Sequence, residues 1–125
     1  MGLISGLLGH ASEVDAERLE KDMEGLLIKG ETIEQAYKLI RDLVVLTSKR
    51  IVFVDKQGLT GRKREYLCIP YRSVERFSKE NTGHVDLDAE IKLWIRGQSE
   101  PLLLEFKGSS NVDQVFRTLS RYVLD

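Results

Sequence analysis

The sequence has few of the residues from which disulfides, metal sites and catalytic centres are built. Its 125 residues include one cysteine, Cys68, and two histidines, His10 and His84. A single cysteine excludes a disulfide within the chain and zinc sites that need several cysteines. Neither histidine stands in a ligand motif such as H-E-x-x-H, and no histidine is adjacent to Cys68. We therefore predict no metal, no cofactor and no enzymatic activity.

The chain also lacks an excess of charge of one sign. Nineteen Lys and Arg residues nearly balance twenty Asp and Glu residues, which gives a formal net charge of -1. Such a chain has no overall field that would attract nucleic acid or an anionic membrane, so any contact of this kind must come from a local patch. We predict no nucleic-acid partner.

Long hydrophobic runs are missing too. The first nine residues, MGLISGLLG, are apolar, but Gly6 and Gly9 interrupt them and no basic segment comes before them. A signal peptide has a basic start and a longer apolar core, and a membrane-spanning helix needs about 20 apolar residues. The expected location is the cytoplasm, which the lone cysteine also fits.

What is present indicates one globular domain. With 42% hydrophobic and 31% charged residues, a chain of 125 residues can bury a core of its own. Residues 12–29 place apolar side chains three or four apart, which predicts an amphipathic helix that ends at Gly30. We divide the chain into an N-terminal arm and helix, 1–30, and the main part, 31–125.

Beyond Gly30 the pattern changes to alternation, which is typical of strands. Within the first run, alternation places Ile33, Tyr37 and Leu39 on one face, with Gln35 among them. The sixth run is the clearest, whereas the fifth also fits a helical turn. The predicted strands are 32–40, 43–47, 50–55, 64–69, 72–79, 85–96 and 102–107.

The chain ends with a second amphipathic pattern after Ser110. Its apolar residues fall on one helical stripe: Val112, Val115, Phe116, Leu119 and Val123. The fold class is therefore mainly β with flanking helices, with about seven antiparallel strands, a C-terminal α-helix that caps them and an N-terminal helix. Periodicity alone leaves a sandwich and a barrel open.

Three motifs resemble the bacterial pleckstrin-homology (PH) domain family. They are a threonine-serine-basic turn at Thr47–Arg50, the loop DKQGLTGRK at Asp55–Lys63, and the strand end IPYRSV at Ile69–Val74. The order of helix, strands and helix is also similar, over essentially the whole chain. The resemblance implies a PH-like barrel or sandwich and a closed ring of identical subunits, fivefold in relatives.

A basic triplet, Arg62, Lys63 and Arg64, is the candidate contact for an anion or a lipid. Eukaryotic PH domains that hold inositol phosphates use the loop between their first two strands. That loop is predicted here to be only Arg41–Asp42, which is too short to hold a headgroup. The alternative function is thus a peripheral domain that makes weak contact with an anionic membrane surface.

Two apolar features are candidate interfaces. Trp94 falls on the polar face of the clearest strand, where it either contacts a partner or packs under the N-terminal helix or a loop. The apolar N-terminal residues have the same ambiguity. Our leading hypothesis is a non-enzymatic interaction module that self-associates into a homo-oligomer through the N-terminal helix and a sheet edge. Under this hypothesis, the module can also bind a different protein as a partner. The N-terminal candidates are Leu3, Ile4, Leu7 and Leu8.

Overall fold

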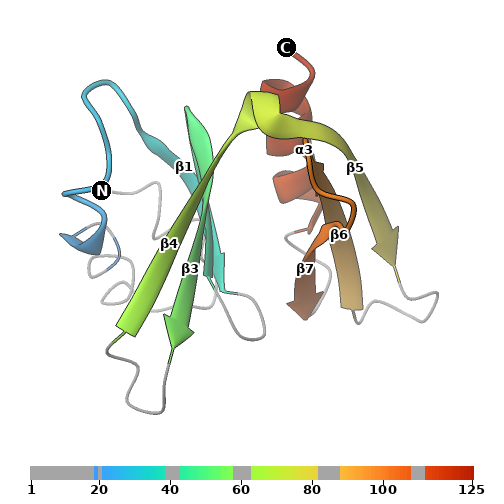
Figure 1. The fold of residues 1–125 in the computed structure, drawn as a ribbon, viewed down its shortest axis with the longest axis horizontal. Helices are drawn as coiled ribbons and strands as arrows, with labels where there is room; N and C mark the ends of the chain where they lie inside the picture. Colours follow the sequence, from blue (N-terminus) through green and yellow to red (C-terminus); the bar gives the residue numbers. More distant parts are fainter. Residues whose placement is uncertain (1–18, 20, 39–42, 58–62, 82–87, 108–111) are drawn as a thin grey trace. The chain divides into compact units, whose positions relative to one another are not determined.

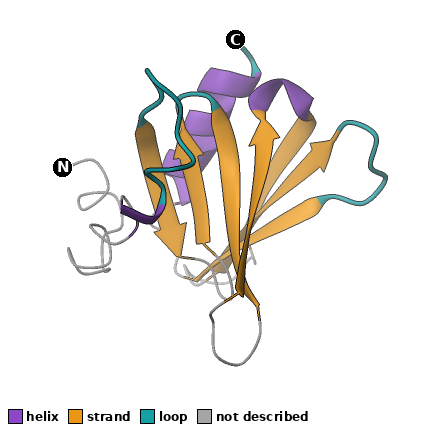
Figure 2. Ribbon diagram, turned by 60° about the vertical axis from the view of Figure 1, so that its left-hand side comes forward, coloured by secondary structure: helices purple, strands orange, loops and turns teal. Residues whose placement is uncertain are grey.

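The computed structural model describes residues 19, 21–38, 43–57, 63–81, 88–107 and 112–125 (Figure 1). Strands make up most of this part, and one long helix follows them (Figure 2). The prediction of a mainly β chain with a C-terminal helix is confirmed. The elements are β1 (Ile33–Lys38), β2 (Leu43–Thr47), β3 (Arg50–Gln57), β4 (Lys63–Pro70), η1 (Tyr71–Ser73), β5 (Val74–Asn81), β6 (Asp88–Ile95), β7 (Leu102–Lys107) and α3 (Val112–Val123).

The chain divides into two compact units, residues 1–68 and 69–125. One sheet has the strand order β1-β2-β3-β4, and the other has the order β5-β6-β7. The described pairs β1–β2, β2–β3, β5–β6 and β6–β7 are antiparallel, as predicted. Strands β2 and β7 have the predicted bounds, because each is an apolar run set between turn residues.

The sheet of the first unit is buried on both faces. Three consecutive residues of β2, Val44, Val45 and Leu46, are fully buried, and so are Ile51 and Val52 of β3. Neighbouring residues of a strand point to opposite faces, so burial of consecutive residues requires cover on both. This explains why these segments are continuous apolar runs in the sequence.

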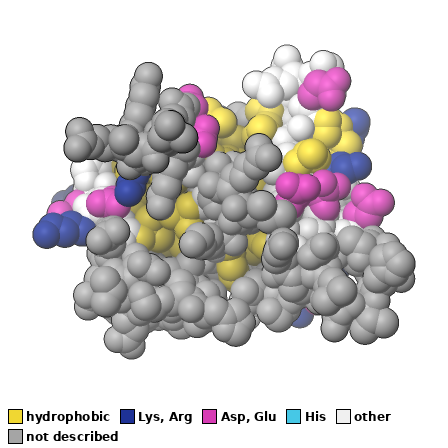
Figure 3. All heavy atoms as spheres, turned by 90° about the horizontal axis from the view of Figure 1, so that it is seen from below, with side chains coloured by type: hydrophobic (Ala, Val, Ile, Leu, Met, Phe, Trp, Pro, Cys, Tyr) yellow, Lys and Arg dark blue, Asp and Glu magenta, His cyan; other side chains and the backbone are white. Residues whose placement is uncertain are grey.

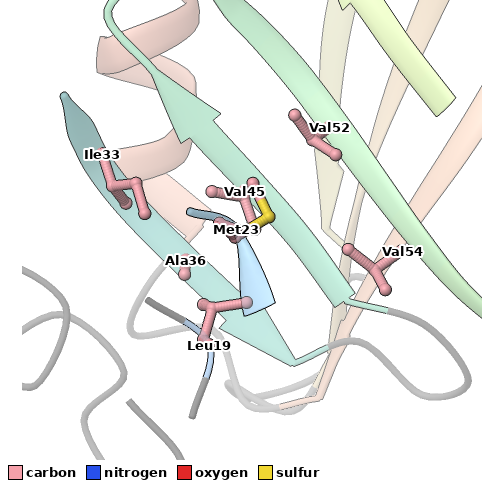
Figure 4. Packing of buried hydrophobic residues seen from close by; sticks show 7 residues of the cluster. All are labelled: Leu19, Met23, Ile33, Ala36, Val45, Val52 and Val54. Carbon is pink, nitrogen blue, oxygen red and sulfur yellow. The ribbon is translucent and has the colours of Figure 1, made fainter. Parts of the chain in front are cut away.

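One of these faces is covered by the segment that precedes β1 (Figure 4). Leu19 and Met23 pack there against residues of β1, β2 and β3, and Met23 is fully buried. The other members of this core cluster are Ile33, Ala36, Val45, Val52 and Val54.

A register shift in β1 changes which residues share a face. The pairing with β2 shifts between Ile33 and Gln35, and Ile33 and Ala36 both join the core cluster although they are three residues apart. An extra residue in a strand reverses the alternation beyond it. The prediction that Ile33 and Tyr37 share a face is therefore wrong.

The N-terminal helix ends earlier than predicted. Within the described residues its helical backbone stops at Asp22, and turns follow, whereas the prediction continued it to Lys29. After Asp22 the backbone tightens into turns, in which the Glu24 and Leu26 amides donate to carbonyls three residues back, at 3.2 and 2.9 Å, and the Ile28 amide donates to the Glu31 carboxylate at 3.1 Å. Gly30 has a φ of 86°, as suits a tight turn before β1. Residues 12–18 of the predicted helix lie outside the described residues.

In the second unit, one face of β6 is buried in the core, as the alternation of its residues predicted. Ala89, Ile91 and Leu93 are buried on one face, and α3 lies alongside β6 and η1 (Figure 1). The buried stripe of α3 includes Val112, Val115 and Leu119. Residues 72–79, which also fitted a helical turn, are split between η1 and β5.

Aromatic contacts join α3 to the rest of the second unit. The rings of Tyr71 and Tyr122 stack with centroids 4.8 Å apart, and those of Phe77 and Phe116 lie 5.1 Å apart. Lys79 on β5 forms an ion pair of 2.7 Å with Asp113 in the first turn of α3. These contacts position the helix against the β5 side of the sheet.

Candidate functional site

The turn from β2 to β3 is held by a buried polar cluster around Glu31. The Glu31 side chain is fully enclosed, and Arg50 donates to its two oxygens from Nη2 at 2.7 Å and from Nε at 2.8 Å. The Thr47 hydroxyl donates to Oε2 at 2.6 Å. The same hydroxyl oxygen accepts from the amides of Lys49 and Arg50, at 3.0 and 2.9 Å.

These contacts shift the ionisation of both charged groups. The hydrogen bond from Arg50 outweighs the cost of burial and lowers the pKa of Glu31 to about 2. The same bond raises the pKa of the Arg50 guanidinium. Arg50 also donates to the Leu26 carbonyl at 3.1 Å and to the Cys68 sulfur at 3.5 Å. The cluster therefore ties the segment before β1 to the β2–β3 turn and to β4, and its role is structural.

The basic triplet does not form a described patch. Arg62 lies outside the described residues, and Lys63 begins β4. Arg64 forms an ion pair of 2.9 Å with Asp22. A hydrogen bond with the Tyr66 side chain, followed by this ion pair, raises the pKa of Arg64. The structure thus places one of the three predicted anion contacts, and its charge is already neutralised within the chain.

Trp94 lies on the face of the β5–β6–β7 sheet opposite the buried residues of β6. We call this the outer face. Alternation and the strand registers place eight described side chains on it. They are Arg76, Ser78 and Glu80 of β5, Glu90, Lys92 and Trp94 of β6, and Leu103 and Glu105 of β7.

The outer face combines apolar and charged groups. The Arg76 guanidinium lies over the Trp94 ring, 4.5 Å from its centroid, so that the half-buried indole is covered on one side by a cation. Leu103 is 50% exposed. Figure 3 shows acidic, basic and hydrophobic side chains side by side on the described surface.

Sequence reasoning found Trp94 but missed its neighbours. Arg76 faces Trp94 only because the β5–β6 register shifts between Val74 and Arg76. The local sequence pattern does not predict this shift. Leu103 could have been found, because it is out of phase with Leu102, Leu104 and Phe106 in the last strand. The N-terminal interface candidates, Leu3, Ile4, Leu7 and Leu8, lie outside the described residues.

Within the described ranges, no group of three or more His, Cys, Asp or Glu residues is arranged to hold a metal ion. In the same part of the chain, no helix is long and apolar enough to cross a membrane.

Comparison with known proteins gives a consistent match over nearly the whole chain. Residues 2–123 match the family model described as "Bacterial PH domain". The protein YjqA of Bacillus subtilis is 44% identical over 121 residues, which cover 96% of this chain and 97% of YjqA.

Two crystal structures have a similar fold. A pleckstrin homology domain from Shewanella amazonensis is 45% identical, with a TM-score of 0.75 and coverage of 97% of this chain and 98% of that one. A protein with a pleckstrin-homology domain from Shewanella loihica is 37% identical, with a TM-score of 0.77 and coverage of 86% and 92%. The predicted PH-like fold is confirmed.

Proposed function

Because the chain belongs to the bacterial PH domain family, we propose that it is a non-enzymatic interaction module that self-associates into a closed ring of identical subunits. PH-like domains are generally binding modules without catalytic activity. The proposed location is the cytoplasm. The observation that carries self-association is the open edge of β7.

Strand β7 is the most regular of the sheet edges whose pairing is described. It pairs with β6 from Leu102 to Lys107 without a register shift, whereas the edge strands β1 and β5 both contain one. Bulges bend an edge strand and protect it from pairing with another chain, and a straight edge lacks this protection. We propose that β7 pairs with a strand edge of the next subunit.

An edge of one subunit that meets a different surface of the next is a heterologous contact, and such contacts close into rings when the rotation allows. We propose that the apolar N-terminal arm completes this contact, with Leu3, Ile4, Leu7 and Leu8 packed on the neighbouring subunit. Arm and edge together bury more apolar area than either alone, which is what a stable assembly needs.

The test replaces Leu3, Ile4, Leu7 and Leu8 together by serine in the full chain, with light scattering after size exclusion as the measurement. We expect the wild type to elute as an oligomer and the variant to lose mass, with unchanged circular dichroism. A matched control, Leu124→Ser, changes a leucine that is 73% exposed and keeps the wild-type mass. An assembly of equal mass for the serine variant excludes the arm from the contact.

The alternative function, binding of anionic lipid, ranks second because Arg64 is already paired with Asp22. It predicts that the chain sediments with vesicles containing phosphatidylserine, more at low salt than at high salt. Binding that is lost in the combined Arg62→Gln and Lys63→Gln variant would favour this function. No sedimentation at low salt would exclude it.

A further inference from the structure

We propose that the outer face of the β5–β6–β7 sheet binds the same face of a second copy of this chain, through a two-fold axis that runs across the strands. This contact is separate from the proposed ring contact at the β7 edge and the N-terminal arm. It would join two rings, or two single subunits where no ring forms.

The first argument is apolar exposure on this face. Leu103 is half exposed on the edge strand β7, and the indole of Trp94 on β6 lies under the Arg76 guanidinium. Aromatic side chains and arginine are the residues most enriched among those that dominate binding energy at protein interfaces.

The second argument is the order of charges along the strands. In register, Arg76 lies opposite Trp94, and Ser78 opposite Lys92, which itself lies opposite Leu103. Two residues further along, three carboxylates form one row across all three strands. That row is Glu80, Glu90 and Glu105.

The acidic row is unfavourable in a free subunit. Directly opposite residues in a sheet have β-carbons about 5 Å apart, and like charges at that separation repel. Among the described side chains, the ion pair recorded for this row is that of Lys92 with Glu80, at 3.8 Å. A surface that brings positive charge to this row would relieve the repulsion.

The same face, turned by two-fold symmetry, brings one cation, Arg76, to the Glu80 end of this row. The basic and acidic rows are four residues apart, or roughly 13 Å at a rise of about 3.3 Å per residue. An axis along the row of Lys92 and Leu103 places each Arg76 over Glu80 of the second copy and each indole N–H over Glu90 of the second copy. The two Leu103 side chains then meet near the axis. The two Lys92 side chains also meet near the axis, where each is 3.8 Å from Glu80 of its own chain, which partly offsets their repulsion.

The face is small compared with standard interfaces of about 800 Å² per partner, so one contact alone is weak. Several contacts between two rings act together and raise the effective affinity. Because the ionic pairs of Arg76 with Glu80 lie on the edge strand β5, where salt screens them, high salt weakens the contact.

A charge exchange in the full-length chain tests the proposal. Arg76→Glu places like charges on both sides of the axis, and the double change Arg76→Glu with Glu80→Arg restores opposite charges. Arg121→Glu, an exposed change of the same type on α3, is the matched control. Circular dichroism verifies the fold of each variant.

Trp94, the single tryptophan of the chain, reports on the face directly. We expect its emission to move to shorter wavelength as the wild-type concentration rises, because the second copy removes water from the indole. Arg76→Glu should weaken association at least tenfold and halve the largest mass seen by sedimentation velocity, while the double variant and Arg121→Glu behave as wild type.

The outcomes separate this proposal from the ring. If Arg76→Glu halves the mass and a ring remains, the result supports both the ring contact and the face-to-face contact. If the wild type is a dimer and Arg76→Glu is a monomer, the result supports the face-to-face contact alone. If Arg76→Glu leaves mass and emission unchanged, or if the double variant is not restored, the face-to-face contact is wrong.

Discussion

At the scale of single residues, the Glu31 carboxylate is the centre of the buried polar cluster. It is fully enclosed and receives three hydrogen bonds from the side chains of Arg50 and Thr47. Breaking a buried pair leaves the other charge without its partner, which costs about 3–5 kcal/mol.

We therefore predict that Glu31→Gln lowers the free energy of unfolding by about 3 kcal/mol, measured by urea denaturation. Lys49→Gln, on the same turn but exposed, should change it by less than about 0.5 kcal/mol. An equal loss for the two variants would show that the cluster is not a stabilising feature.

The same carboxylate gives the fold a defined sensitivity to acid. The pKa of Glu31 lies near 2 in the folded chain, below its ordinary value of 4.5. The unfolded chain therefore takes up the proton first, and the stability that Glu31 contributes is complete above about pH 5 and is lost as the pH falls towards 2. Unfolding free energies measured at pH 6 and pH 3 should differ less for Glu31→Gln than for the wild type. Identical pH dependence in the two proteins would contradict the assignment.

At the scale of elements, the segment before β1 is part of the core of the first unit. Met23 is fully buried in the cluster with Leu19 and β1 to β3, whereas Ile28, five residues on, is 57% exposed. Met23→Ala should lower the unfolding free energy by about 2–4 kcal/mol, and Ile28→Ala by much less. Thermal and urea denaturation of both variants measure this difference, and similar values would place Met23 outside the core.

Pairing of the β7 edge with a neighbouring subunit should slow hydrogen exchange of the β7 amides. Alternate residues of an edge strand point their N–H groups away from the sheet, towards solvent in a free subunit. If β7 pairs with a neighbouring subunit, nearly all amides from Leu102 to Lys107 should exchange slowly in the assembly. In the monomeric serine variant about half of them should exchange fast. Fast exchange of the alternate amides in the assembly would place the subunit contact elsewhere.

Local pattern was enough to predict most elements, but not the contacts between them. The bounds of β2 and β7 follow from apolar runs between turn residues, and the stripe of α3 from its helical spacing. The helix end was missed because turns with hydrogen bonds three residues back follow Asp22, and the faces of β1 were missed because a bulge reverses them. At the candidate surface, Trp94 was evident, whereas Arg76 reaches it only through a shifted register.

At the scale of the whole molecule, near-neutral net charge and separated surface charges fit a chain that binds copies of itself. With 19 basic and 20 acidic residues, subunits do not repel one another strongly, and local patches decide how they meet. The β7 edge with the N-terminal arm and the outer face are two such surfaces. Both proposals require association of the intact chain in solution.

Sedimentation equilibrium of the full-length protein at micromolar concentration measures this most directly. The account predicts a mass that is a defined multiple of the 14.3 kDa subunit and that corresponds to a closed ring or to two such rings. A mass of 14.3 kDa at all concentrations tested would contradict self-association as the function of this domain.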